Sequence, residues 1–119
     1  MFNIEFFETE EGKKPVVEFL NSLDMKMRVK VLRNIQHLQQ NGYNLREPYS
    51  KPLNDGIFEL RTQSGGNIIR VLYFFHVGNT IVMTNGFVKK TQKTPPAEIA
   101  KAINYQKIYL QRKEAQKNG

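Results

Sequence analysis

The stretch from Ile57 to Val88, IFELRTQSGGNIIRVLYFFHVGNTIVMTNGFV, contains three runs rich in β-branched and aromatic residues, a composition typical of strands. The runs cover residues 57–63, 68–77 and 80–88, and short links that contain glycine separate them. Links of this length join neighbouring strands as hairpins. The stretch therefore predicts a three-stranded antiparallel meander.

The residues before this stretch predict one strand and two helices. Residues 2–6 alternate apolar and polar side chains, as in a half-buried strand, and a short helix is expected over residues 16–20. A second helix, capped by Asp24, is expected to end at Gly42, and residues 43–56 are expected to form a loop. The apolar positions of the second helix recur at steps of three and four: Met25, Met27, Val31, Leu32, Ile35 and Leu38.

A last helix is expected after Thr94 and the two prolines that follow it. Its apolar side is predicted to contain Ile99, Ala100, Ile103 and Leu110. The 119 residues suffice for one hydrophobic core of moderate size. The sequence thus predicts a single α+β domain over residues 1–119, with a small mixed or antiparallel sheet, two N-terminal helices and a C-terminal helix.

The composition restricts the partners and the chemistry. The 18 lysines and arginines exceed the 11 acidic residues by seven, so the surface should attract a polyanion such as nucleic acid, an acidic membrane or an acidic protein. The absence of cysteine excludes disulfides and cysteine zinc sites, and two histidines are too few for an ordinary histidine metal site. We therefore expect no metal and no cofactor, and any catalysis to be metal-free or to use carboxylates.

The N-terminal residues lack the basic start and the long apolar run of a secretory signal. No stretch approaches the length of a membrane span. We expect a cytoplasmic protein that does not bind membranes.

The turn between the first two strands fixes which side chains face each other. A two-residue turn and a four-residue link both place Gln63 opposite Ile68, and Arg61 then lies opposite Arg70. Two like charges in this position are unfavourable unless an anion lies between them. Glu59, on the same face, and a bound phosphate are the two candidates.

The third strand extends this row. If Val77 pairs with Thr80, Arg70 lies opposite Phe87, and Lys89 follows on the same face. Guanidinium groups bind phosphate oxygens, and an aromatic ring can stack on an unpaired base, so the row suits single-stranded RNA. Phe87 could equally be a core residue under the last helix.

The opposite face of the sheet is expected to pack on the two N-terminal helices. Its predicted residues are Phe58, Leu60, Ile69, Val71, Tyr73, Phe75, Val82 and Val88. Tyr73 is therefore interpreted as a core residue, and the placement of His37 and His76 does not support a paired-histidine mechanism. The basic side of the second helix, with Lys26, Arg28, Lys30 and Arg33, is either a solvated surface or an auxiliary contact for RNA or a partner.

Cleavage of RNA without metal would use the ribose 2′-hydroxyl as nucleophile, which requires a base, an acid and positive charge at the phosphate. Arg61 and Arg70 suit the charge. Lysines among other cations have lowered pKa values, so Lys89, Lys90 or Lys93 could exchange protons, with Glu59 as an alternative base.

Three segments of the chain carry a family resemblance. Residues 51–61, KPLNDGIFELR, residues 69–73, IRVLY, and residues 86–95, GFVKKTQKTP, resemble the RelE/ParE superfamily of bacterial toxins, and most closely its HigB-type, phage Gp49-like branch. The resemblance implies a toxin encoded beside an antitoxin, cleavage of mRNA that commonly lies in the ribosomal decoding site, and a HigA-like helix-turn-helix antitoxin that also binds its operator.

The resemblance also implies site residues. Arg61, Arg70, Lys89 and Lys90 match basic positions expected to be catalytic or to bind RNA. We add Phe87, Lys93, Lys51 and Tyr49 as expected RNA-binding residues. Typical RelE toxins use a tyrosine near the C-terminal end, but Tyr105 and Tyr109 of the last helix are not obvious counterparts, so the general base stays open. ParE relatives on the same fold inhibit DNA gyrase instead of cleaving mRNA, so inhibition of gyrase is a second hypothesis for the function. A non-catalytic nucleic-acid-binding module is the third hypothesis.

Overall fold

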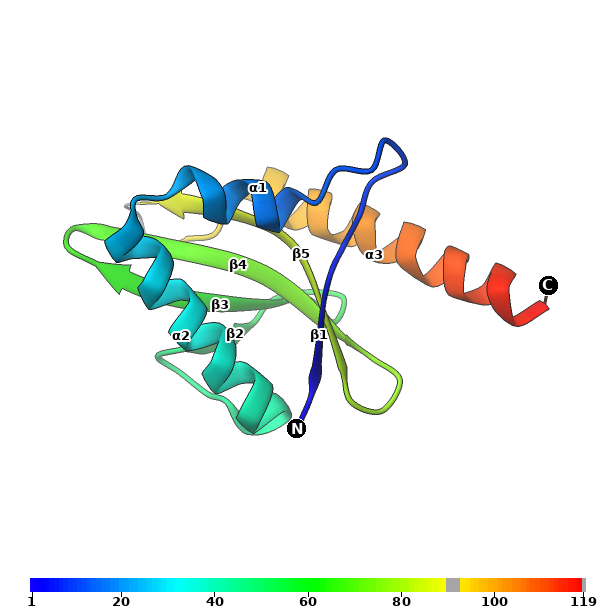
Figure 1. The fold of residues 1–119 in the computed structure, drawn as a ribbon. Helices are drawn as coiled ribbons and strands as arrows, with labels where there is room; N and C mark the ends of the chain where they lie inside the picture. Colours follow the sequence, from blue (N-terminus) through cyan, green and yellow to red (C-terminus); the bar gives the residue numbers. More distant parts are fainter. Residues whose placement is uncertain (90–92, 119) are drawn as a thin grey trace.

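The computed structural model describes residues 1–89 and 93–118. Five strands form one mixed sheet in the order β1-β5-β4-β3-β2, in which β1 runs parallel to β5 and the other neighbours are antiparallel (Figure 1). The strands are β1 (Asn3–Phe6), β2 (Ser50–Pro52), β3 (Phe58–Ser64), β4 (Asn67–His76) and β5 (Thr80–Lys89). The α+β fold with an N-terminal strand beside a meander is confirmed.

Helices cover both faces of the sheet (Figure 1). They are α1 (Pro15–Ser22), α2 (Met25–Asn41) and α3 (Pro96–Asn118), and a 3₁₀ turn, η1 (Gly42–Asn44), follows α2. The helices α1 and α2 pack on one face, and α3 packs on the other. Among the described residues, no helix combines the length and the apolar composition that a membrane span requires.

Local signals fix the start of α2. The Asp24 side chain accepts a hydrogen bond from the backbone N–H of Met27 at 2.8 Å, which confirms the predicted cap. The Arg28 guanidinium donates to the carbonyl oxygens of Leu20, Asn21 and Leu23, the last residues of α1 and the link after it. Arg28 therefore closes the end of α1 and is not a free cation of the basic side of α2.

Two details of the helices differ from the prediction. Met25 and Leu32 are 75% and 42% exposed, because the buried stripe of α2 follows Val31, Ile35 and Leu38. In α3, Ala100 and Leu110 are exposed, and the buried residues are Ala102 and Tyr109. The prediction counted aliphatic side chains, whereas the tyrosines provide much of the packing of α3, with Tyr105 stacked on Phe7.

The predicted loop over residues 43–56 was wrong in part, since it contains η1 residues and β2. Three residues are too few to show an alternating pattern, and β2 ends at a proline. It pairs with β3 only from Leu60 to Phe58. The rest of the outer edge of β3 is therefore not covered by a strand.

A β-bulge between β4 and β5 changes the predicted faces. The turn pairs His76, and not Val77, with Thr80, and Thr84 is the extra residue between the pairs Tyr73–Met83 and Leu72–Asn85. Val82 consequently packs on the α3 side, not under the N-terminal helices as predicted. Val88 was also expected in that core but is 41% exposed.

The remaining residues predicted for the core face are placed as expected, in contact with α1 and α2. Tyr73 is 1% exposed, and its hydroxyl lies 2.5 Å from the Ser50 hydroxyl. Burial raises the pKa of Tyr73 to about 12, and the bond to Ser50 opposes this shift. The prediction that Tyr73 is a core residue is confirmed.

Gly86 on β5 lets α1 approach the sheet. A Cβ atom at this position would lie 2.4 Å from Cδ2 and 2.8 Å from Cε2 of Phe19.

We predict that Gly86→Ala destabilises the protein by about 1–3 kcal/mol, because the aromatic ring or the backbone must move. Urea unfolding measures the change. The control is Gly66→Ala, because a Cβ there meets no described atom within 4 Å. Equal unfolding midpoints for the two variants would contradict the prediction.

Candidate functional site

The face of the sheet covered by α3 carries the predicted charged row. Arg61 pairs with Arg70, and Arg70 pairs with Phe87, so the predicted register is confirmed for these three residues. In the next row Gln63, Ile68 and Lys89 are aligned. The side chains of each row share one face, since directly opposite residues point the same way.

The carboxylate of Glu59 lies between the two arginines. Its Oε2 is 3.4 Å from Nε of Arg61, and its Oε1 is 3.7 Å from Nε of Arg70. The hydroxyl of Thr94 donates a hydrogen bond to Oε1. The sequence left two candidates for the anion between the arginines, the Glu59 carboxylate and a bound phosphate. The structure places the Glu59 carboxylate there. We call Glu59, Arg61, Arg70 and Thr94 the ion cluster.

The members of the ion cluster differ in their access to solvent. Glu59 and Arg70 are 1% and 0% exposed, whereas the side chain of Arg61 is 19% exposed. Burial lowers the pKa of Arg70, the Glu59 carboxylate raises it and the Arg61 charge lowers it, and the net result lies below the ordinary value. Within the cluster, only Arg61 and Thr94 therefore have surface to offer a ligand, and that of Thr94 is small, at 8%.

The start of α3 is fixed above this face. The Asn85 side-chain amide donates to the backbone oxygen of Glu98 at 3.2 Å and to its carboxylate at 3.0 Å. The bond from Thr94 to Glu59 fixes the segment just before the helix. The ion cluster therefore joins β3, β4 and the entry to α3.

The other predicted site residues lie around the cluster or away from it. Phe87 is half-buried and packs against the apolar cluster under α3, which agrees with its alternative reading as a core residue. Lys89 is half-buried, and Lys93 is exposed beside Thr94. Lys51 is exposed on β2 and lies opposite Glu59 in the strand register of β2 and β3. Lys90 lies outside the described residues.

Tyr49 directly precedes β2, at the outer edge of β3. The residue is 44% exposed, and its ring lies edge-on to the ring of His37 on α2, with the ring centres 6.0 Å apart. The Tyr49 carbonyl accepts a hydrogen bond from the backbone N–H of Arg61 at 2.8 Å. Its side chain lines a groove that Arg61 also lines.

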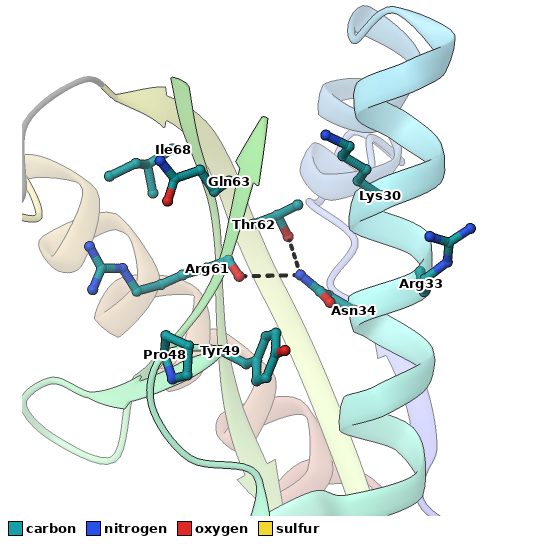
Figure 2. A pocket seen from close by; sticks show the side chains of 9 residues that line it. All are labelled: Lys30, Arg33, Asn34, Pro48, Tyr49, Arg61, Thr62, Gln63 and Ile68. Atoms are coloured by element: carbon teal, nitrogen blue, oxygen red, sulfur yellow. Dashed lines mark hydrogen bonds between the residues drawn. The ribbon is translucent and has the colours of Figure 1, made fainter. Parts of the chain in front are cut away.

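This groove lies between α2 and the outer edge of β3 and has a volume of about 420 Å³ (Figure 2). Lys30 and Arg33 of α2 line it together with Tyr49 and Arg61. The Asn34 side chain donates to the Thr62 hydroxyl at 2.8 Å and to the Arg61 carbonyl at 3.3 Å, which joins the helix to the strand. Sequence reasoning missed the groove because it missed β2, whose short length leaves this edge open.

The histidines and the tyrosines of α3 lie outside the ion cluster. His76 lies edge-on to Tyr109, with the ring centres 5.1 Å apart. The Tyr109 hydroxyl donates to the Glu5 carboxylate at 3.1 and 3.2 Å, and burial, followed by the charge of Glu5 and this bond, raises the pKa of Tyr109 to about 12. Tyr105 stacks on Phe7, with ring centres 4.5 Å apart. Both tyrosines attach α3 to the N-terminal segment.

Comparison with known proteins gives one family and two relatives. The family model described as phage derived protein Gp49-like (DUF891) matches residues 18–107. The probable endoribonuclease HigB1 of Mycobacterium tuberculosis, from strain CDC 1551 / Oshkosh and from strain ATCC 25618 / H37Rv, is 42% identical over 59 residues, which are 50% of this chain and 46% of each relative. The chain spans about half the length of the curated relatives it matches. The matches confirm the resemblance to the HigB-type, Gp49-like branch.

The ion cluster predicts a specific stability effect. We expect Glu59→Gln to destabilise the protein by about 3–5 kcal/mol, since it keeps the shape of the side chain but removes the carboxylate charge that faces buried Arg70. Urea unfolding measures the loss. The double variant Glu59→Gln/Arg70→Met should recover part of it, and Glu10→Gln, on an exposed residue, serves as the control. A Glu59→Gln variant as stable as the control would show that the cluster contributes little.

Proposed function

The chain belongs to the Gp49-like family of phage-derived proteins, and from this membership and the charged row we propose that it is an mRNA-cleaving toxin of a type II toxin–antitoxin pair. The observation that carries the proposal is the partly exposed side chain of Arg61, whose guanidinium is held by a buried carboxylate on the α3 face of the sheet. The name of the M. tuberculosis relatives, probable endoribonuclease, supports the same reading.

We propose that Arg61 contacts the phosphate that is cleaved. A guanidinium offers two N–H groups to two phosphate oxygens, and its charge stabilises the phosphorane that forms during the reaction. Glu59 and Arg70 are positioning residues in this scheme, because both are buried and both act on Arg61 through the ion cluster. Phe87 and Lys51, on the same face, border the path of the RNA.

The reaction that suits this site is attack of a ribose 2′-hydroxyl on the adjacent phosphorus. The 2′-oxygen forms a bond to phosphorus, the bond to the 5′-oxygen breaks, and the products are a 2′,3′-cyclic phosphate and a 5′-hydroxyl. One group must remove the proton of the 2′-hydroxyl and another must protonate the leaving 5′-oxygen. We assign this exchange to the lysines Lys89, Lys90 and Lys93.

Glu59 is less suited to accept the proton. One of its oxygens faces Arg61, and the other faces Arg70 and accepts the Thr94 hydrogen bond. Both oxygens are therefore engaged by groups of the protein, and the side chain is 1% exposed, so neither oxygen is open to a ribose hydroxyl. Its role in the proposal is therefore to hold Arg61.

The proposed biological setting follows from the substrate. The RNA is message bound to ribosomes in the cytoplasm, and its cleavage inhibits translation. The partner that restrains the toxin is a HigA-like helix-turn-helix protein encoded beside it. The net charge of +7 favours association with ribosomal RNA as well as with message.

We predict that the purified protein cleaves mRNA and that Arg61→Ala lowers the cleavage rate about 100-fold or more, because a charge that stabilises the transition state is lost. Cleavage is measured with end-labelled mRNA, on ribosomes in magnesium buffer and on free RNA in EDTA. Arg61→Lys, which keeps the charge but not the fork of donors, should be intermediate. Lys101→Ala, on the exposed side of α3, is the control.

The ends of the products test the mechanism. Attack by the 2′-hydroxyl leaves a 2′,3′-cyclic phosphate, and an RNA with deoxyribose at the cleaved position should stay intact. Products with a 5′-phosphate and a 3′-hydroxyl would contradict the mechanism. Intact message at concentrations that stop growth would contradict the proposed activity, and inhibition of DNA supercoiling by gyrase under those conditions would favour the gyrase-directed reading.

A further inference from the structure

The groove between α2 and β3 is strongly basic. Lys30, Arg33 and Arg61 line it, and none of the lining residues that the structure describes is acidic. Among the described residues, neither Lys30 nor Arg33 forms an ion pair with a carboxylate. Two cations that no described carboxylate pairs with therefore stand beside a hollow surface, which is a suitable place for a polyanion.

Arg61 connects this groove with the ion cluster. Figure 2 shows the Arg61 side chain leaving β3 on the side away from α2, while Lys30 extends from α2 toward the strand. The backbone of Tyr49 still contacts the edge at Arg61, but beyond this point no described strand pairs with the outer edge of β3. The cations of the groove and the exposed cation of the cluster thus flank one open edge.

The backbone of this edge does not suit the addition of a peptide strand. The N–H of Arg61 donates to the carbonyl of Tyr49 at 2.8 Å, and the carbonyl of Arg61 accepts from the Asn34 side chain at 3.3 Å. A strand that pairs here would need both groups. The exposed ring of Tyr49, in contrast, can stack on an unpaired base. These features favour a nucleic-acid strand over a peptide.

We propose that the groove binds the single-stranded RNA that Arg61 engages, with Lys30 and Arg33 on neighbouring phosphates and Tyr49 stacked on a base. The RNA crosses the open edge of β3, so that the phosphate at Arg61 and those in the groove belong to one strand. The inference rests on the proposed function for its ligand, an RNA chain, but it concerns binding and not cleavage.

The test uses a single-stranded 2′-O-methyl RNA oligonucleotide, which lacks the 2′-hydroxyl nucleophile. Lys30→Ala/Arg33→Ala is compared with Lys101→Ala/Lys107→Ala, which removes the same charge from exposed positions of α3. We expect the groove variant to bind about 10- to 100-fold more weakly at low salt. The slope of log K against log salt should become shallower by about 1.4, because each phosphate contact with a single strand contributes about 0.7. The α3 variant should change neither value.

A second variant separates stacking from charge. Tyr49→Leu should weaken binding about tenfold and leave the salt slope unchanged, because stacking releases no counterions. Thermal unfolding of each variant establishes that it is folded. Equal weakening of the groove and α3 variants would overturn the proposal, and so would unchanged affinity in the groove variant.

The binding experiments distinguish failure of the groove proposal from failure of the cleavage proposal. If wild type leaves mRNA whole but the oligonucleotide binds through Lys30 and Arg33, the cleavage proposal fails and the groove stands. If wild type cleaves mRNA and the groove variant binds normally, the groove proposal fails alone. A polyglutamate peptide that binds as tightly as the oligonucleotide, with the same dependence on Lys30 and Arg33, would overturn the assignment to RNA.

Discussion

The pairing of Arg61 with Arg70 is the constraint on which the site depends. The tight turn at Gly65 and Gly66 fixes it, and two guanidinium groups on one face of a sheet require an anion between them. The fold supplies Glu59 from the same strand as Arg61. Glu59 and Arg70 are both buried, so each charge needs the other nearby to remain stable in the interior. Of the two arginines, Arg61 is the one that reaches solvent.

The same cluster links the sheet to α3. Thr94 donates to Glu59, and Glu98, in the first turn of the helix, accepts a hydrogen bond from the side-chain amide of Asn85. The bulge at Thr84 aligns Asn85 with Leu72 and keeps Phe87 opposite Arg70. The entry to α3, the buried charges and the end of β5 thus form one connected unit, so a change in one of them should disturb the others.

Part of this structure could be predicted from the sequence because the signals are local. The glycine turn sets the register of β3 and β4, and Asp24 sets the start of α2. The pairing of Arg70 with Phe87 was predicted from a turn register that was off by one residue, and the bulge at Thr84 compensated for the error. No composition signal marks a bulge, so Val82 was assigned to the wrong face. The groove depends on where the three-residue β2 ends, which is a tertiary feature without a pattern of its own.

The central claim, that the ion cluster presents Arg61 to an RNA phosphate, is tested most directly by NMR of the arginine side-chain Nε–H groups. Arg61→Lys assigns the Arg61 signal, and the protein is titrated with a 2′-O-methyl RNA oligonucleotide. We predict a saturable shift of the Arg61 signal with the same dissociation constant as binding, and a smaller shift of buried Arg70. An Arg61 signal that stays unchanged at saturation would contradict the account.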